Sequence, residues 1–339
     1  SSRLALTDIQ GLTARPGASL SEYTRFGIGG PADLLIETAN EAAFTAALAL
    51  LREQGRPHVV IGSGTNLVVS DAGFRGTVLR YTASSIRREG LMVECDVGVE
   101  LMDLVRYTVD QDLQGIQTLM GIPGAVGGAV YGNAGAYGHS ISEVVRTVRF
   151  FDGYTIGNVS GEGCEFRYRE SVFKRNRNWI VLRARMEFSE GDGPGLRKTA
   201  DEILAIRNEK FPPTLKCAGS IFKNLHEAEL PAAVRAEVPD KVVREGKIPS
   251  AWFLEQVGAK DSWEGRIHIA PYHANLIYNA GGATAEELCR MIARLKKAVF
   301  ARFGILLEEE VQYVGFEGEP AAYGATGSVA GRVASGKAS

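Results

Sequence analysis

Apolar residues recur with the spacing of one helix face in some segments of this chain and with the spacing of one strand face in others. Each such segment predicts a helix or a strand. A helix is predicted over 40–54, where one face carries Phe44, Ala47, Leu48 and Leu51. Further helices are predicted near 99–114 and over 196–208. Short apolar or alternating runs predict strands over 58–61, 67–69, 92–97, 145–151 and 180–188. Because helices and strands are interspersed, we predict a mixed α+β fold.

The most clearly bounded helix begins after Thr284. Thr284 and Glu287 have the spacing of a capping box. One helical face then carries Leu288, Met291, Ile292, Leu295 and Val299. Gly304 stands where a C-terminal cap belongs. The sequence therefore predicts a helix from Thr284 to Gly304.

Junctions rich in turn residues and proline divide the chain into units. Residues 189–195 read SEGDGPG, and Pro212-Pro213 interrupts the chain after the helix at 196–208. We predict a first unit over 1–80, a second over 81–208 and a third over 209–315. Residues 316–339 are rich in glycine, alanine and serine, which predicts a flexible tail.

Composition narrows the class of protein. The net charge of −2 leaves no basic field for nucleic acid or an anionic membrane surface. No apolar run approaches the ~20 residues of a membrane span. The four cysteines are far apart and the five histidines lack metal-ligand spacing, which argues against a metal site and for a reducing compartment. We expect a cytoplasmic monomer that acts on small molecules.

The segment 121–138, GIPGAVGGAVYGNAGAYG, contains seven glycines, four alanines and no charge. A core helix is not expected there, because each glycine costs about 1 kcal/mol against alanine. Such backbone can pass close to a large flat ligand or donate N–H groups to an anion. The segment therefore predicts a nucleotide-cofactor site.

Two other glycine clusters compete for that cofactor. FGIGGPAD, residues 26–33, does not follow a buried strand, and Pro31 interrupts it, so a dinucleotide fingerprint is not favoured. GSGTNL, residues 62–67, follows a strand but leads into another extended run. This loop is expected to bind phosphate through turn N–H groups and the side chains of Ser63, Thr65 and Asn66, without a helix dipole. A bare turn is the alternative.

Five motifs occur in order: GSGTNL, the 121–138 segment, YRES, AGSIFKN and LEEEV. Together they resemble the UDP-N-acetylenolpyruvoylglucosamine reductase (MurB) family, from about Thr24 to Gly315. The resemblance implies a two-subdomain FAD-binding unit of the vanillyl-alcohol-oxidase (PCMH) type and a C-terminal α/β substrate-binding domain. It also implies non-covalent FAD, with NADPH reducing UDP-N-acetylenolpyruvoylglucosamine to UDP-N-acetylmuramate, a cell-wall precursor.

The resemblance also implies the catalytic residues. Ser220 matches the family's proton donor, Arg169 its carboxylate partner and Glu310 its catalytic glutamate. Glu310 is chosen within LEEEV because the family's residue directly precedes the valine. From the residues alone the alternatives are a turn-capping serine, a surface salt bridge and a solvated charge run. Cys217 is a rival proton donor.

The remaining implied residues bind cofactor or substrate. Those expected to hold FAD are Gly62, Ser63, Gly64, Thr65, Asn66, Leu67, Gly121, Pro123, Gly124, Gly127, Gly128, Gly132, Asn133, Gly135 and Ala136. Those expected to bind substrate are Tyr137, Tyr168, Lys210, Asn224 and His273.

This chain resembles the short-loop branch of the family, because the segment after Phe188 is too short for a tyrosine lid. Closure over substrate is expected from elsewhere, such as the third unit swinging at Pro212. Two other functions compete: an alcohol oxidase or dehydrogenase on the same flavin-binding fold, and a flavin-binding protein without catalysis.

Overall fold

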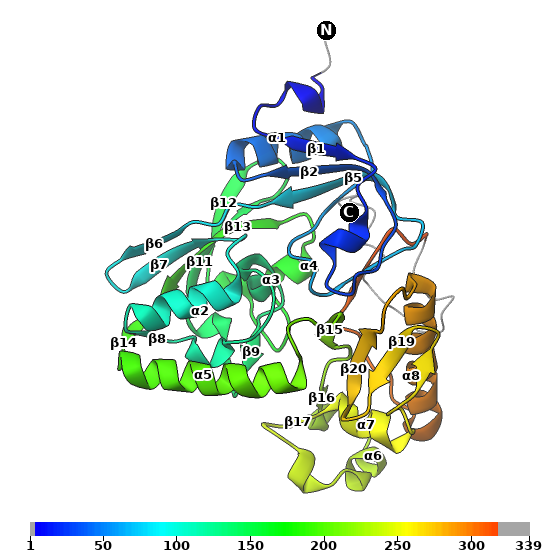
Figure 1. Ribbon diagram of the computed structural model, residues 1–339. Coiled ribbons are helices and arrows are strands. Elements are labelled where there is room, and N and C mark those ends of the chain that lie inside the picture. Colours follow the sequence, from blue (N-terminus) through cyan, green and yellow to red (C-terminus); the bar gives the residue numbers. More distant parts are fainter. Residues whose placement is uncertain (1–3, 318–339) are drawn as a thin grey trace.

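The computed structural model describes residues 4–317, and the predicted tail lies, from residue 318 on, outside them. The first unit is a four-stranded sheet of order β1-β2-β5-β3, in which β5 is parallel to both β2 and β3. Its strands are β1 (Thr13–Pro16), β2 (Ala32–Thr38), β3 (His58–Val60) and β5 (Phe74–Tyr81). α1 (Glu41–Glu53) covers this sheet at the top of Figure 1. Asn40 caps α1, whose buried residues include the predicted apolar face, so this helix is confirmed.

The second unit is a five-stranded antiparallel sheet of order β12-β11-β13-β7-β6. Its strands are β6 (Ile86–Glu89), β7 (Met92–Asp96), β11 (Val145–Phe151), β12 (Ile156–Ser160) and β13 (Ile180–Glu187). Its helices are α2 (Leu101–Asp110), α3 (Val126–Tyr131), α4 (Val172–Arg175) and α5 (Gly193–Lys210). α2 and α5 contact each other, and α3 packs on β7 and β13 (Figure 1). Short pairs β8 (Leu113–Gln114) with β14 (Ser189–Glu190), and β9 (Gly135–Ala136) with β10 (His139–Ser140), complete the unit.

Two local predictions in this unit are wrong. The glycine-rich segment contains helix α3, because one helical face buries Val126, Ala129 and Val130 and this packing outweighs the low helix propensity of glycine. The helix predicted over 196–208 is confirmed as part of α5, but its predicted start is wrong, because α5 begins at Gly193, inside the predicted turn. Asp192 caps it by accepting a hydrogen bond from the Gly195 N–H, and a proline occupies its first turn.

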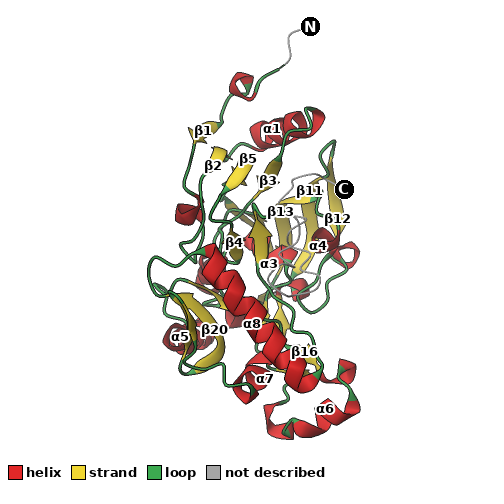
Figure 2. Ribbon diagram, turned by 90° about the vertical axis from the view of Figure 1, so that its right-hand side faces the viewer, coloured by secondary structure: helices red, strands yellow, loops and turns green. Residues whose placement is uncertain are grey.

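The third unit is a sheet of order β15-β20-β19-β18 with α7 (Ser250–Gln256) and α8 (Ala285–Phe303). Its strands are β15 (Cys217–Ser220), β18 (Trp263–Glu264), β19 (Ile267–Ala270) and β20 (His273–Asn279). The predicted capping box of α8 is present and Gly304 ends the helix with φ +71°, so this helix is confirmed. α8 runs along this unit in Figure 2. β16 (Leu225–His226) pairs with β17 (Lys247–Ile248), and α6 (Ala232–Glu237) lies between them in sequence.

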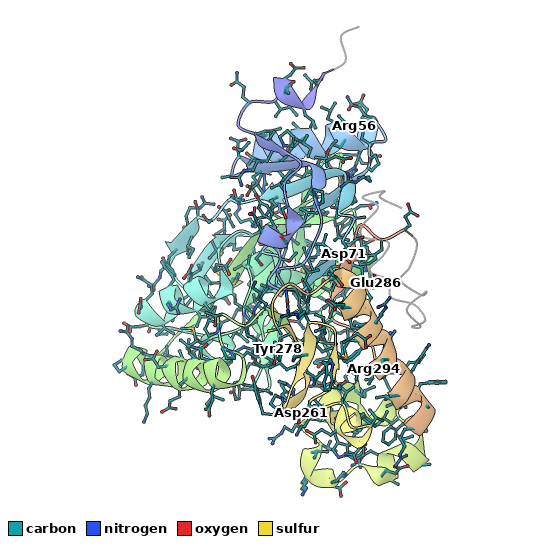
Figure 3. The ribbon with its side chains drawn as sticks, turned by 45° about the vertical axis from the view of Figure 1, so that its right-hand side comes forward. Arg56, Asp71, Asp261, Tyr278, Glu286 and Arg294 are labelled. Atoms are coloured by element: carbon teal, nitrogen blue, oxygen red, sulfur yellow. The ribbon has the colours of Figure 1, made fainter. Side chains whose placement is uncertain are left out.

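The third unit is anchored to the first at several places. Near the end of the described chain, β21 (Gln312–Val314) pairs in parallel with β4 (Leu67–Val69) of the first unit. The Asp71 carboxylate accepts hydrogen bonds from the N–H groups of Ala285 and Glu286 and so caps α8; Asp71 and Glu286 are labelled beside each other in Figure 3. Phe26 and Val68 lie in the same apolar core as α8. A swing about Pro212 alone would break these contacts, so the structure argues against that expected closure.

The predicted boundaries at residues 80, 208 and 315 stay predictions. Within residues 4–317, no helix has both the length and the apolar character needed to cross a bilayer.

Candidate active site

The two predicted glycine loops meet in space although they are far apart in the sequence. The Ser63 hydroxyl accepts a hydrogen bond from the Ala125 N–H at 3.2 Å. A Cβ built on Gly124 would lie 3.1 Å from Thr65 Oγ1. The 62–66 loop leads into strand β4 and not into a helix, as predicted. The structure therefore brings these two loops together as a single wall.

The glycines of this wall fall into two classes. Gly64 and Gly124 have φ of +73° and +107°, and a Cβ on Gly64 would lie 1.8 Å from the Tyr23 carbonyl oxygen. Gly62 and Gly128 are exposed, lack a left-handed φ and have open space where a Cβ would stand. Nothing among residues 4–317 requires glycine at these two positions, and Gly128 lies inside α3, where alanine would favour the helix. A ligand lying against the backbone explains both glycines, so the wall formed by the two loops is a cradle that fits a large flat cofactor.

Other predicted cofactor residues have roles within the protein. Asn133 is buried, and its side-chain amide donates to the Arg167 carbonyl at 2.8 Å. The Asn66 carbonyl accepts the Gln312 N–H, which links the first loop to β21. Gly127 lets α3 approach the sheet, because a Cβ there would lie 3.0 Å from Val97 Cβ. Leu67 pairs with Gln312 of β21, and Ala136 pairs with His139 in the β9–β10 hairpin. The cofactor roles predicted for Leu67, Gly121, Pro123, Gly132, Gly135 and Ala136 stay predictions.

Arg169 ties the glycine-rich segment to the third unit. Its guanidinium donates to the carbonyls of Asn133 at 3.2 Å and Gly135 at 2.9 Å, and its Nε lies 3.7 Å from Glu310 Oε1. Arg169 has a φ of +52°, a left-handed conformation that costs free energy in a non-glycine residue. The backbone is therefore held in a strained conformation that directs this side chain to one place.

The three consecutive glutamates of LEEEV have three different surroundings. The Glu308 side chain is 69% exposed and pairs with Lys223 at 3.0 Å. The Glu309 side chain is 4% exposed, forms an ion pair with the equally buried Lys296, and accepts from the Tyr313 hydroxyl at 2.9 Å. Glu310 alone of the three faces Arg169. The structure thus distinguishes three carboxylates that the sequence could not order.

Ser220 lies beside this glutamate segment. It ends β15, and the next residue, Ile221, accepts a hydrogen bond from the Glu310 N–H at 2.8 Å. The Ser220 hydroxyl oxygen lies 3.5 Å from His273 Nε2. Cys217, the rival proton donor, is fully buried in an apolar cluster with Phe211 and Leu276. Of the two candidates, only Ser220 is even partly exposed.

Four further residues are predicted to bind substrate, and the structure gives each of them different surroundings. Tyr168 precedes Arg169, its hydroxyl is hydrogen-bonded by the Asn224 backbone, and burial raises its pKa. The Lys247 ammonium lies 3.9 Å from the Tyr168 ring centroid. Lys210 ends α5, and burial together with Arg207 lowers its pKa. Tyr137 is 59% exposed between β9 and β10. Their roles stay predictions.

Sequence reasoning missed two cations. Lys223 is 11% exposed within AGSIFKN; burial lowers its pKa, but Glu308, Glu310 and Glu170 hold it above its usual value overall. Arg207 is half-buried, its Nε has no hydrogen-bond partner among residues 4–317, and burial, Arg25 and Arg169 lower its pKa. Arg207 lies one helical turn before Lys210, and that spacing was the available signal. Within the same residues no metal-binding group of His, Cys, Asp and Glu is found.

Comparisons with known proteins identify two family domains in this chain. A model of the FAD binding domain matches residues 32–166, and a model of the C-terminal domain of UDP-N-acetylenolpyruvoylglucosamine reductase matches residues 211–314. The UDP-N-acetylenolpyruvoylglucosamine reductase of Solibacter usitatus is 56% identical over 312 residues, covering 92% of this chain and 100% of that protein. The reductase of Heliobacterium modesticaldum is 34% identical, covering 88% and 90%.

A solved structure shares the fold. The crystal structure of UDP-N-acetylenolpyruvylglucosamine reductase (MurB) from Thermus caldophilus matches with a TM-score of 0.69 at 26% identity, covering 89% of this chain and 98% of that one. The resemblance and the fold class predicted from the sequence are both confirmed.

Proposed function

This chain belongs to the UDP-N-acetylenolpyruvoylglucosamine reductase family, and on that premise we propose that it reduces UDP-N-acetylenolpyruvoylglucosamine to UDP-N-acetylmuramate with electrons from NADPH. The product is a precursor of the bacterial cell wall. The four cysteines are free and buried, which favours a reducing compartment such as the cytoplasm.

One observation carries the proposal. Glu310 connects the two other catalytic candidates: its N–H bonds the residue after Ser220, and its carboxylate lies 3.7 Å from Arg169 Nε. Arg169 in turn holds the backbone of the glycine-rich wall. An acid, a fixed cation and a flavin cradle therefore converge from three distant segments of the chain.

The glycine wall is the place for FAD. The open positions at Gly62 and Gly128 and the hydroxyls of Ser63 and Thr65 would hold it against the backbone. When bound there, FAD would supply the hydride chemistry that links NADPH to the β-carbon of the enolpyruvyl group.

The chain's own residues handle charge and proton. Negative charge grows on the α-carbon of the substrate and spreads into its carboxylate. The Arg169 guanidinium, a planar and permanently charged fork, suits that carboxylate. Glu310 orients Arg169 through its ion pair. Ser220 donates its hydroxyl proton to the α-carbon, on the face opposite the hydride.

The deciding experiment is NADPH oxidation by the purified, FAD-loaded protein with and without UDP-N-acetylenolpyruvoylglucosamine. Oxidation should depend on this substrate and match UDP-N-acetylmuramate formed mole for mole. Oxygen consumption with simple alcohols in place of the substrate would support the oxidase alternative. A protein that cannot take up FAD would contradict both enzyme functions.

Stopped-flow half-reactions of Ser220→Ala test the proton donor. Reoxidation of the reduced flavin by substrate should fall at least about 10²-fold relative to its reduction by NADPH, in line with the usual worth of general acid catalysis. The matched control is Ser262→Ala, which removes a hydroxyl whose one hydrogen bond within residues 4–317 goes to the nearby Ala259 carbonyl. If Ser220→Ala keeps the wild-type ratio, Ser220 is not the donor.

A further inference from the structure

A serine that acts as an acid needs help from its surroundings. Its hydroxyl is a weak acid, and loss of the proton leaves an alkoxide that must be stabilised by a nearby donor. In this structure His273 Nε2 lies 3.5 Å from Ser220 Oγ. Both residues belong to neighbouring antiparallel strands, β15 and β20, in which Ser220 stands opposite Leu276. The backbones that carry the two side chains are therefore fixed relative to each other by one sheet.

The second ring nitrogen of His273 reveals which nitrogen carries the hydrogen. The Asn275 backbone N–H donates to His273 Nδ1 at 3.4 Å. A backbone N–H can only donate, so Nδ1 must be the acceptor nitrogen of a neutral imidazole. The ring hydrogen then stands on Nε2 and is directed at the serine oxygen.

The surroundings of His273 keep the ring neutral. The residue is 9% exposed, and its ring packs against the edge of Phe211. Burial, followed by the charges of Lys210 and Lys260, lowers the pKa of His273 to about 4. At neutral pH the ring therefore carries one hydrogen, on Nε2. It cannot act on Ser220 as a general base, because Nε2 has no lone pair to offer.

The frame around this pair is fixed by a second amide. The Asn275 side chain is buried and bonds both backbone groups of Phe222: its oxygen accepts the N–H and its nitrogen donates to the carbonyl, each at 3.0 Å. One strand thus carries the histidine that faces Ser220 and the asparagine that locks the backbone just beyond it.

We propose that His273 is a positioning residue for Ser220: its Nε2–H donates to the serine oxygen and so turns the serine hydrogen toward the substrate. The inference deepens the proposed function and rests on it. In the protonation step the Ser220 O–H bond breaks as the C–H bond forms at the α-carbon, and the electron pair stays on Oγ. The Nε2–H then hydrogen-bonds the alkoxide, and solvent water restores the serine proton. His273 neither gains nor loses a proton.

Two substitutions separate this role from simple packing. In His273→Gln the amide nitrogen can reach the position of Nε2, whereas in His273→Asn it matches only the Nδ1 end. We expect substrate-dependent reoxidation, relative to reduction by NADPH, to fall about 10²-fold in His273→Asn and to recover to within about 10-fold of wild type in His273→Gln. Equal losses in both, or none in His273→Asn, would overturn the inference. His268→Gln on the neighbouring strand β19 is the matched control.

A double-mutant cycle tests whether the two residues act together. In the Ser220→Ala background, His273→Asn should add no further loss, because the hydroxyl that it positions is gone. Additive losses would mean that His273 acts independently of Ser220.

A measurement without substrate separates this inference from the proposed function. Imidazole ¹⁵N spectra of the FAD-loaded protein should show His273 as the neutral Nε2–H tautomer at pH 7. The His273 signal is identified by its loss in His273→Gln, and it should shift in Ser220→Ala. An Nδ1–H tautomer or a charged ring would overturn the hydrogen bond. A wild-type protein that ignores the substrate, yet shows the Nε2–H tautomer, would instead contradict the proposed function and the catalytic part of the inference.

Discussion

Three adjacent glutamates offer a sharp test of the energetics, because the same substitution should have three different effects. Glu309→Gln removes one charge from an ion pair in which both side chains are 4% exposed. Breaking a buried pair by removing one partner costs about 3–5 kcal/mol. Glutamine still offers an oxygen to the Tyr313 hydroxyl, so we expect about 3 kcal/mol, at the low end of that range.

Thermal unfolding followed by circular dichroism measures this cost. For a protein of this size, 1 kcal/mol corresponds to about 2 °C, so Tm should fall by about 6 °C. The matched control is Glu308→Gln, whose side chain is 69% exposed and whose pairing with Lys223 is worth at most about 1 kcal/mol. Glu310→Gln should leave Tm close to wild type and instead slow flavin reoxidation by substrate.

Removing both buried charges completes the test. The double variant Lys296→Met/Glu309→Gln leaves no unpaired charge in the core, so it should regain most of the lost stability. The reasoning is refuted if Glu309→Gln unfolds within about 2 °C of Glu308→Gln, or if the double variant is less stable than Glu309→Gln alone.

Three further outcomes follow from the site. Arg169→Lys keeps the charge but loses the planar fork that bonds two carbonyls and Glu310, so stopped-flow reoxidation by substrate should slow about 10²-fold; an unchanged rate would remove the carboxylate role. Gly128→Ala should raise the Tm of the protein without FAD, because an exposed helical glycine costs about 1 kcal/mol, and should weaken FAD binding in a fluorescence titration; unchanged affinity would take Gly128 out of the cradle. The pKa of His273 is lowered to about 4, so between pH 6.5 and 4 the unfolded chain binds a proton that the native state does not, and stability falls as pH falls. In urea unfolding, wild type should lose on the order of 3 kcal/mol relative to His273→Gln between pH 7 and 4, and parallel curves would contradict this.

Elements with a complete local signal were predictable. Helix α8 has its capping box, its apolar face and its terminal Gly304 within one stretch of sequence. Helix α3 was not predicted, and helix α5 was predicted to begin too late. The glycines of α3 hide a face that is buried against β7 and β13, and the start of α5 is set by a capping aspartate that reads as a turn residue.

The candidate site residues were also predicted from local motifs. Which of them contact one another was not predictable in this way. The sequence predicted a glycine-rich loop at 62–66 and another at 121–138. It did not predict that the Ser63 hydroxyl would accept a hydrogen bond from the Ala125 N–H and so join the two loops. Lys223 and Arg207 were missed, because their importance comes from burial among charges contributed by other segments.

The sequence by itself determined the class of fold, the family resemblance and the chemical groups available: a serine, an arginine, a glutamate and a glycine wall. Only the tertiary structure decided which of three glutamates meets Arg169, that His273 faces Ser220 with a hydrogen to donate, and that the third unit is anchored to the first through β21 and Asp71. The physical reason is the separation in sequence between the residues that interact. Helix caps and periodicity depend on residues a few positions apart, whereas burial, ion pairing and the direction of a hydrogen bond depend on segments that meet only when the chain has folded.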